Sequence, residues 1–156
     1  MTAAQQFVSV RNLEQSDFQQ WSVYWDQYQA FYKVALDKET TELTWARFFN
    51  SAEPVHCAVA TDGSRLLGFV HFVFHRSTWA RNDFCYLEDL YVCSSARGKR
   101  VGKQLIEFVQ GQAQEKRCDR LYWHTQETNQ TAQRLYDWIA EKPGVIEYRM
   151  ALPGQD

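Results

Sequence analysis

The stretch Arg97-Gly98-Lys99-Arg100-Val101-Gly102-Lys103 decides how the rest of this 156-residue sequence is interpreted. It follows the β-rich run Phe84 to Val92 and the polar break Ser94-Ser95-Ala96, and it opens a run with helical apolar spacing. The first N–H groups of a helix have no partners within the helix, and the helix dipole adds partial positive charge there. Two glycines let a ligand come close. This stretch can therefore hold a diphosphate at a helix start.

Two common phosphate-binding motifs are absent from this stretch. It lacks the GxxxxGK[ST] pattern of a Walker loop, and it lacks the GxGxxG pattern of dinucleotide-binding folds. A basic turn with glycines is also compatible with an ordinary helix start. Its interpretation therefore depends on the elements around it.

Downstream of the basic turn, the pattern alternates between helix and strand. The predicted elements are a helix from Val101 to about Arg117, a strand from Arg120 to Thr125, a helix from about Thr131 to Ala140, and a strand from Val145 to Leu152. The order strand, loop, helix, strand is the unit that produces parallel strand pairing. We therefore expect the strand from Phe84 to Val92, before the turn, and the strand from Arg120 to Thr125 to be parallel neighbours.

Upstream of the basic turn, the sequence predicts helices followed by antiparallel strands. The predicted elements are a strand from Phe7 to Leu13, a helix starting at the capping box Ser16 to Gln19, a short helix from Leu43 to Asn50, and strands from Val55 to Ala60 and from Arg65 to Arg76. Asp62-Gly63 between the last two strands is a hairpin turn signal. The expected fold class is α/β (α+β), with a mixed, mostly antiparallel sheet flanked by helices.

Length and composition favour one globular domain spanning residues 1–156. Hydrophobic residues make up 45% of the chain, which is enough to form a core. The longest apolar run, Leu66 to Phe74, is too short to cross a bilayer, and Met1 to Gln6 is too polar for a signal peptide. We therefore expect a cytoplasmic protein without membrane contact. The four cysteines are far apart with no CxxC pair, so no metal site is expected.

Charge is unevenly distributed along the chain. Between Ser94 and Arg120 there are seven basic and three acidic residues, whereas between Glu14 and Glu53 there are seven acidic and three basic ones. The first region suits phosphates, and the second, which includes Asp37, Glu39 and Glu42, suits a cationic substrate. The net charge of −2 gives no general attraction for nucleic acid.

With these elements in place, the chain resembles the GNAT superfamily of acetyl-CoA-dependent N-acetyltransferases. The pyrophosphate loop of that family follows the pattern [Q/R]-x-x-G-x-[G/A] after a strand, and Arg97 and Gly102 match its first and last positions. Arg100 replaces the middle glycine, and its guanidinium can compensate by charge. The resemblance covers Arg65 to Leu152, and it is strongest to small enzymes that acetylate polyamines, histone tails or related amines.

The resemblance implies a fold with a splayed parallel strand pair and a set of residues that hold acetyl-CoA. In the family, the strand before the loop separates from its neighbour, and its backbone holds the pantetheine arm. Transferred to this sequence, the acetyl-CoA site consists of Leu90, Tyr91, Val92, Arg97, Gly98, Lys99, Arg100, Val101, Gly102, Lys103, Asn129 and Ala132. Asn129 also suits a helix N-cap.

Two residues are predicted to be catalytic. An alkyl amine is protonated at neutral pH and must lose a proton before it can attack, and Glu88, predicted on the same strand face as Leu90, is the candidate base. The resemblance implies that Tyr136 lies beside the sulfur and stabilises the departing thiolate. Asp89 is expected to face the other way and to be structural. No nucleophile motif is present, and direct attack in a ternary complex needs none.

Three alternatives remain open at this stage. The same core can acetylate lysines of protein or histone tails instead of a small amine. A non-catalytic CoA-binding regulator would keep the loop but gain nothing from Glu88 and Tyr136. An oxidoreductase with a dinucleotide-binding fold fits less well, because the glycine fingerprint is missing. Relatives of this kind often dimerise through sheet edges and carboxy-terminal strands, so a homodimer is also possible.

Overall fold

The computed structural model describes residues 7–153, and the chain divides into two compact units, Met1–His124 and Thr125–Asp156. The first unit contains β1 (Ser9–Asn12), α1 (Phe18–Phe31), α2 (Lys38–Phe48), β2 (Val55–Thr61), β3 (Leu66–His75), β4 (Phe84–Val92), α3 (Val101–Glu115) and β5 (Arg120–Tyr122), with single 3-10 turns at Gln15–Asp17 and Ser94–Ala96. The second unit contains α4 (Gln130–Ile139).

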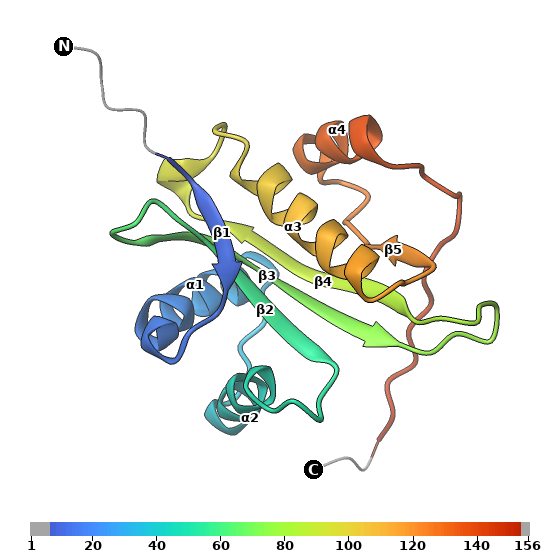
Figure 1. Cartoon of the computed structure of the whole chain (residues 1–156), viewed down its shortest axis with the longest axis horizontal. Coiled ribbons are helices and arrows are strands. Elements are labelled where there is room, and N and C mark those ends of the chain that lie inside the picture. The colour runs from blue at the N-terminus through green and yellow to red at the C-terminus, as the bar shows by residue number, and fades with distance from the viewer. Residues whose placement is uncertain (1–6, 154–156) are drawn as a thin grey trace. The chain divides into compact units, whose positions relative to one another are not determined.

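The five strands form one mixed sheet in the order β1-β2-β3-β4-β5 (Figure 1). Neighbouring strands from β1 to β4 pair antiparallel, whereas β4 and β5 pair parallel. Between β2 and β3 the chain turns at Gly63, whose φ of +96° suits glycine. The mostly antiparallel sheet with one parallel pair, predicted from the order of the elements, is confirmed.

Helices cover both faces of this sheet (Figure 1). On one face, α1 buries Trp21 and Trp25 against Phe69 of β3, with Trp25 and Phe69 rings 5.9 Å apart. On the other face lies α3, which buries Val101, Leu105, Ile106, Val109 and Ala113. Since both faces are covered, β3 reads as an almost continuous apolar run instead of an alternating one.

A β-bulge interrupts the pairing of β3 with β4. His71 pairs with Asp89, whereas the next residue, Phe72, pairs with Leu87, so Glu88 is an extra residue without a cross-strand partner. Residues directly opposite each other share a face of the sheet. Leu87 therefore lies on the α3 face with Phe72, and Asp89 lies on the α1 face with His71. Simple alternation, from which we predicted the orientation of Glu88, does not hold across the bulge.

The amino-terminal helices differ in detail from the prediction. The turn before α1 is closed by Asp17, whose Oδ2 accepts from the Glu14 N–H at 2.8 Å, so the predicted capping box beginning at Ser16 is wrong. Asp17 also binds Arg11 through two contacts of 2.7 and 3.0 Å. Helix α2 begins five residues before the predicted Leu43, because Asp37 caps it by accepting from the Thr40 N–H.

The carboxy-terminal unit contains no strand among its described residues, 125–153. The predicted strand from Val145 to Leu152 is therefore wrong for this structure. Its apolar side chains, Val145, Ile146, Tyr148, Met150 and Leu152, are between 72% and 88% exposed. A strand requires a partner for its backbone groups, and apolar alternation alone does not supply one.

Candidate active site

The centre of the candidate site is the opening between β4 and β5. The two strands pair only where Phe84–Tyr86 lies beside Arg120–Tyr122, and β4 then continues to Val92 while β5 has ended. In the first unit, the edge of β4 after Tyr86 therefore has no strand on that side. The predicted separation of the parallel pair is confirmed.

The backbone of β4 presents polar groups to this opening at alternate residues. The Cys93 N–H donates to the Leu67 carbonyl on β3 at 2.8 Å. Because successive residues direct their backbone groups to opposite sides, those of Leu90 and Val92 point away from β3. The Val92 carbonyl accepts from Arg97 Nε at 3.3 Å, consistent with that direction. The Tyr91 carbonyl instead lies close to Gly68 of β3.

The basic turn forms a compact loop at the start of α3. Gly98 and Arg100 both have left-handed φ values, +80° and +61°, and α3 begins at Val101 without a side-chain cap. The Arg100 side chain has no hydrogen-bond acceptor, so it leaves the first N–H groups of α3 uncapped. A Cβ placed on Gly102 would lie 3.8 Å from Val92 and 3.9 Å from Leu90, which is ordinary contact. An alanine would therefore fit at this position, in agreement with the [G/A] of the family pattern.

Arg100 occupies the position where the family pattern has a glycine. Its left-handed backbone is one that glycine adopts without strain and that other residues adopt at a cost. The backbone trace that the pattern requires is thus kept in this chain, and a guanidinium is added to it. Together with Arg97, Lys99 and Lys103, this loop combines a helix start with positive charge, which suits a diphosphate group. These residues fit the phosphate portion of CoA.

Glu88 lies at the bulge, beside the opening. Partial burial raises the pKa of its carboxyl above the usual value, the charge of Asp89 acts in the same direction, and His71 opposes them. The charge of Glu88 in turn contributes to the raised pKa of Tyr122 on β5, after burial as the main cause. A carboxylate with a raised pKa is a better proton acceptor near neutral pH than an ordinary glutamate.

A buried hydrogen-bonded chain next to Glu88 was not predicted from the sequence. His71 Nδ1 lies 2.9 Å from Asp89 Oδ2, and Trp21 Nε1 donates to His71 Nε2 at 3.0 Å. His71 was not among the residues predicted to be functional, and the residues that the structure describes contain no cluster able to hold a metal. A histidine inside an apolar strand was the available signal, but its partners depend on strand pairing.

The remaining predicted residues belong to the second unit. Asn129 caps α4, with its Oδ1 accepting from the Ala132 N–H at 3.2 Å, as predicted. Tyr136 lies seven residues further, almost two turns along the same helix. The cap fixes where the helix begins and hence the face of the helix on which Tyr136 lies.

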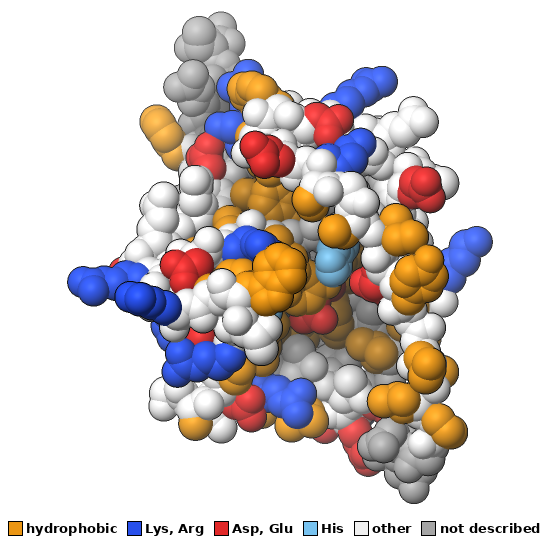
Figure 2. Space-filling model, turned by 90° about the vertical axis from the view of Figure 1, so that its right-hand side faces the viewer, with side chains coloured by type: hydrophobic (Ala, Val, Ile, Leu, Met, Phe, Trp, Pro, Cys, Tyr) orange, Lys and Arg blue, Asp and Glu red, His pale blue; other side chains and the backbone are white. Residues whose placement is uncertain are grey.

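The acidic residues near α2 are partly committed to local contacts. Asp37 caps the helix, and hydrogen bonds from Thr40 lower the pKa of its carboxyl. Glu42 lies 3.6 Å from Lys38. These contacts weaken the expectation that the acidic group attracts a cationic substrate. Figure 2 shows acidic and basic side chains interspersed over the face it displays, so no patch of a single sign dominates that face.

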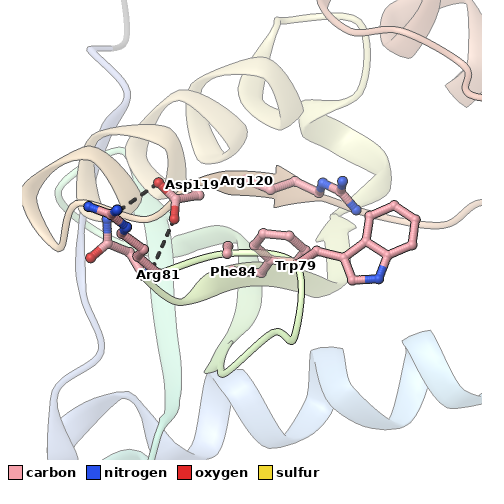
Figure 3. Close-up of a pocket in the computed structure, with 7 residues that line it drawn as sticks. Trp79, Arg81, Phe84, Asp119 and Arg120 are labelled. Atoms are coloured by element: carbon pink, nitrogen blue, oxygen red, sulfur yellow. Dashed lines mark hydrogen bonds between the residues drawn. The ribbon is translucent and has the colours of Figure 1, made fainter.

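A separate pocket of about 420 Å³ lies at the other end of the parallel pair. It is lined by Trp79, Ala80, Arg81, Asn82, Phe84, Asp119 and Arg120. Figure 3 shows Asp119 bonded to the loop before β4, while Arg120 extends over the Phe84 ring at 4.4 Å from its centroid. None of the residues predicted to be catalytic or to bind the cofactor lines this pocket.

Comparison with known proteins gives consistent results. Residues 9–138 match the family model described as the acetyltransferase (GNAT) family. The D-amino-acid N-acetyltransferase HPA3 of Saccharomyces cerevisiae is 35% identical over 144 residues, which cover 91% of this chain and 89% of that protein. The thialysine N-epsilon-acetyltransferase of Mus musculus is 30% identical over 107 residues, covering 60% of this chain and 62% of that protein.

Solved structures show the same fold. A probable acetyltransferase superposes with a TM-score of 0.79 at 21% identity, covering 95% of this chain and 99% of that one. AAC(6')-Iy in complex with a bisubstrate analogue of CoA and acetylneamine also gives a TM-score of 0.79, at 18% identity, with coverage of 94% and 99%. No helix among residues 7–153 is both long and apolar enough to cross a membrane.

Proposed function

Since the chain belongs to the acetyltransferase (GNAT) family and is thus an acetyl-CoA-dependent N-acetyltransferase, we propose that it acetylates the primary amine of a small molecule by direct attack. The observation that carries this proposal is Glu88, a carboxylate with a raised pKa, beside the unpaired edge of β4. A base at that position suits an acceptor that arrives as an ammonium ion.

The opening and the basic loop support the assignment of the acetyl-CoA site. Arg97, Lys99, Arg100 and the start of α3 would hold the diphosphate, and the backbone groups of Leu90 and Val92 would hold the pantetheine arm. Tyr91 would contribute through the position of the strand, because its own carbonyl is directed to β3. Asn129 and Ala132 complete the proposed set. Bound acetyl-CoA supplies the activated acetyl group.

The residues of this chain supply the proton transfers. Glu88 would accept the proton of the acceptor ammonium, directly or through a water, so that the nitrogen can attack. The backbone N–H of Leu90 or Val92 would polarise the thioester carbonyl. Tyr136 would donate a hydrogen bond from its hydroxyl to the departing sulfur. A phenol is a weaker acid than a thiol, so hydrogen bonding precedes any full proton transfer.

The acceptor class follows from the relatives in combination with the site. One relative is named for D-amino acids and the other for thialysine, so amino acids with a free amino group join polyamines as proposed acceptors. A protein lysine remains the second candidate, because its ε-amine has the same chemistry. The two compact units would act as one N-acetyltransferase domain, which the match over residues 9–138 supports.

Release of free CoA from acetyl-CoA tests the proposal. The panel contains polyamines, D- and L-amino acids, thialysine and lysine peptides, and the enzyme variants are Glu88→Gln and Glu115→Gln. Glu115 is the last residue of α3 and is exposed. Its replacement by glutamine removes the same charge as Glu88→Gln, so Glu115→Gln is the matched control. We expect release with one amine class, a loss of roughly 100-fold or more in Glu88→Gln, and no change in the control. Release by peptides alone would favour the lysine acetyltransferase, and binding of CoA without any turnover would favour the regulator.

We also propose that the protein is a cytoplasmic homodimer. The four cysteines are free, as in a reducing compartment. Residues 145–152 expose Ile146, Tyr148, Met150 and Leu152 at every second position, a pattern that suits pairing with the same segment of a second copy. Sedimentation analysis of the wild type beside Ile146→Asp tests this idea. A wild type that sediments as a monomer at all concentrations would refute it.

A further inference from the structure

Both ring nitrogens of the buried His71 are engaged. Its side chain is almost fully inaccessible and lies among aromatic rings, with centroids 4.5 Å from Phe69, 4.9 Å from Phe48 and 5.0 Å from Trp25. Nε2 contacts Trp21 Nε1 and Nδ1 contacts Asp89 Oδ2. A flipped or shifted ring would leave buried polar atoms unsatisfied, which costs more than a hydrogen bond gains. The orientation of the imidazole is therefore fixed.

The hydrogen bonds that link Trp21, His71 and Asp89 all run in one direction. The indole N–H of Trp21 can only donate, so His71 Nε2 must be an acceptor. The proton of the neutral ring is then on Nδ1, from which it is donated to the Asp89 carboxylate. Successive N–H groups point toward the same negative charge, and each strengthens the next. Asp89 is thus held firmly on the α1 face of the sheet.

Asp89 is the residue immediately after the bulge. If the pairing of Leu90 with Val70 and of Asp89 with His71 continued regularly, Glu88 would lie opposite Phe72 on the α3 face. The observed pairing places Leu87 opposite Phe72 instead. Phe72 is fully buried, so the regular register would bury a carboxylate behind α3 without a partner. The bulge is what keeps Glu88 out of the core.

We propose that Trp21, His71 and Asp89 form a positioning chain that fixes the register of the bulge and thereby holds Glu88 at the opening between β4 and β5. The catalytic part of this proposal rests on the proposed function of Glu88, whereas the positional part does not. Trp21 and His71 contact no reacting group, so they act through Asp89 and the backbone of β4.

Asp89 serves Glu88 in a second way, by its charge. Among the described residues, the titratable groups that interact electrostatically with Glu88 include Asp89 on its own strand, His71 on β3 and Tyr122 on β5. On the α1 side, Tyr28 faces Asp89, and its pKa is raised by burial and then by that charge. Asp89→Asn keeps an oxygen to accept from His71 and removes the charge. His71→Phe keeps the aromatic packing and removes the hydrogen bonds to Trp21 and Asp89.

The positional claim is tested without enzymatic activity. Glu88→Cys is introduced in a Cys118→Ser background, because the other three cysteines are buried. The rate of thiol alkylation at residue 88 is followed by peptide mass spectrometry. We expect rapid alkylation with His71 present and a rate lower by about tenfold or more in His71→Phe, because a buried thiol reacts only after local opening. Trp21→Phe, which removes the N–H and keeps an aromatic ring, should give an intermediate rate.

The kinetic claim is tested on the intact enzyme with an active amine. We expect His71→Phe to lower kcat by about 10- to 100-fold, a loss typical of a misplaced group, with the KM for acetyl-CoA unchanged. Asp89→Asn should keep kcat on the plateau and move the acidic limb of the rate profile to lower pH. His56→Phe, on the α3 face, is the matched control and should change neither.

The outcomes separate the two proposals. Equal alkylation rates with and without the His71→Phe substitution, with folded protein by circular dichroism, would overturn the positioning chain. If His71→Phe does not fold, Trp21→Phe decides by the same measurement. Slow alkylation in the variant without any amine-dependent turnover in the wild type would uphold the positioning chain and refute the proposed function. A general loss of stability in His71→Phe without a change in the alkylation rate or in kcat would reduce His71 to a packing residue.

Discussion

Replacing Arg100 by glycine separates the backbone role of this position from its charge. Arg100 has a left-handed φ of +61° at the residue before α3. That conformation costs a non-glycine residue roughly 1–2 kcal/mol. Glycine avoids this cost but loses roughly 0.5–1 kcal/mol more backbone entropy on folding. We therefore expect Arg100→Gly to stabilise the free protein by about 0.5–1 kcal/mol, which is about 1–4 °C in Tm for a chain of this size.

The same substitution should weaken CoA binding. A hydrogen bond to a charged group contributes about 1.5–3 kcal/mol, so the loss of one guanidinium–phosphate contact should raise Kd roughly 10- to 100-fold. Isothermal titration with CoA measures the change in Kd, and thermal unfolding of the free protein measures the predicted stabilisation. Arg100→Asn should behave similarly, because asparagine tolerates the left-handed conformation and carries no charge.

Lys33 provides the matched control. It follows α1 with a left-handed φ of +58°, outside the loop, so Lys33→Gly should raise Tm by a similar amount and leave the Kd for CoA unchanged. An Arg100→Gly protein that binds CoA as tightly as the wild type would show that the guanidinium does not replace the missing glycine by charge. A lower Tm in Arg100→Gly would show that the arginine side chain has packing contacts worth more than the strain.

Three further predictions concern single side chains. Tyr136→Phe should lower kcat by about 10- to 100-fold with little change in CoA affinity, because only the hydroxyl is lost. Steady-state kinetics measures this loss, and Tyr32→Phe, which loses the same group, is the control. Because the pKa of Glu88 is raised, kcat/KM should begin to fall at a pH above the pKa of an ordinary glutamate as pH decreases and Glu88 becomes protonated. In a pH series, Glu88→Gln should lack this acidic limb. Asp17→Asn should destabilise the fold by about 2–3 kcal/mol at pH 7, measured by urea unfolding, since a buried partner of Arg11 is removed.

The pH dependence of the Asp17 effect follows from its pKa. Burial works to raise that pKa, but hydrogen bonds from Arg11 and from the Glu14 N–H outweigh it, and the pKa is lowered. A lowered folded-state pKa stabilises the protein above the unfolded value, near 3.9, and this stability disappears as pH falls through the folded value. The gap between wild type and Asp17→Asn should therefore close in acid. A constant gap would contradict the ionic explanation.

The sequence was sufficient for elements that are determined by their own residues. The runs that became β3 and β4, and the spacing that became α3, are local signals, and the parallel pair followed from the order of elements. The asparagine cap of α4 is a local signal too. These are the elements for which propensity, periodicity and capping agree.

Features that require two segments to meet could not be predicted from one of them. The bulge at Glu88 appears only when β4 is paired with β3, because a single strand shows no register. The link from Trp21 to His71 joins residues 50 positions apart. Residues 145–152 have the alternation of a strand but no partner strand among residues 7–153. Pattern alone therefore predicted one strand too many and missed one hydrogen-bonded chain.

The unpaired edge of β4 also has a consequence for handling the protein. From Leu87 to Val92, alternate N–H and C=O groups face outward in the first unit as they do at the border of any sheet, and such borders recruit strands from other molecules. In the proposed acetyl-CoA site, the extended cofactor arm with its amide groups would take the place of the missing strand. We therefore expect CoA to protect against aggregation as well, so that purification with CoA present yields more monodisperse protein than purification without it.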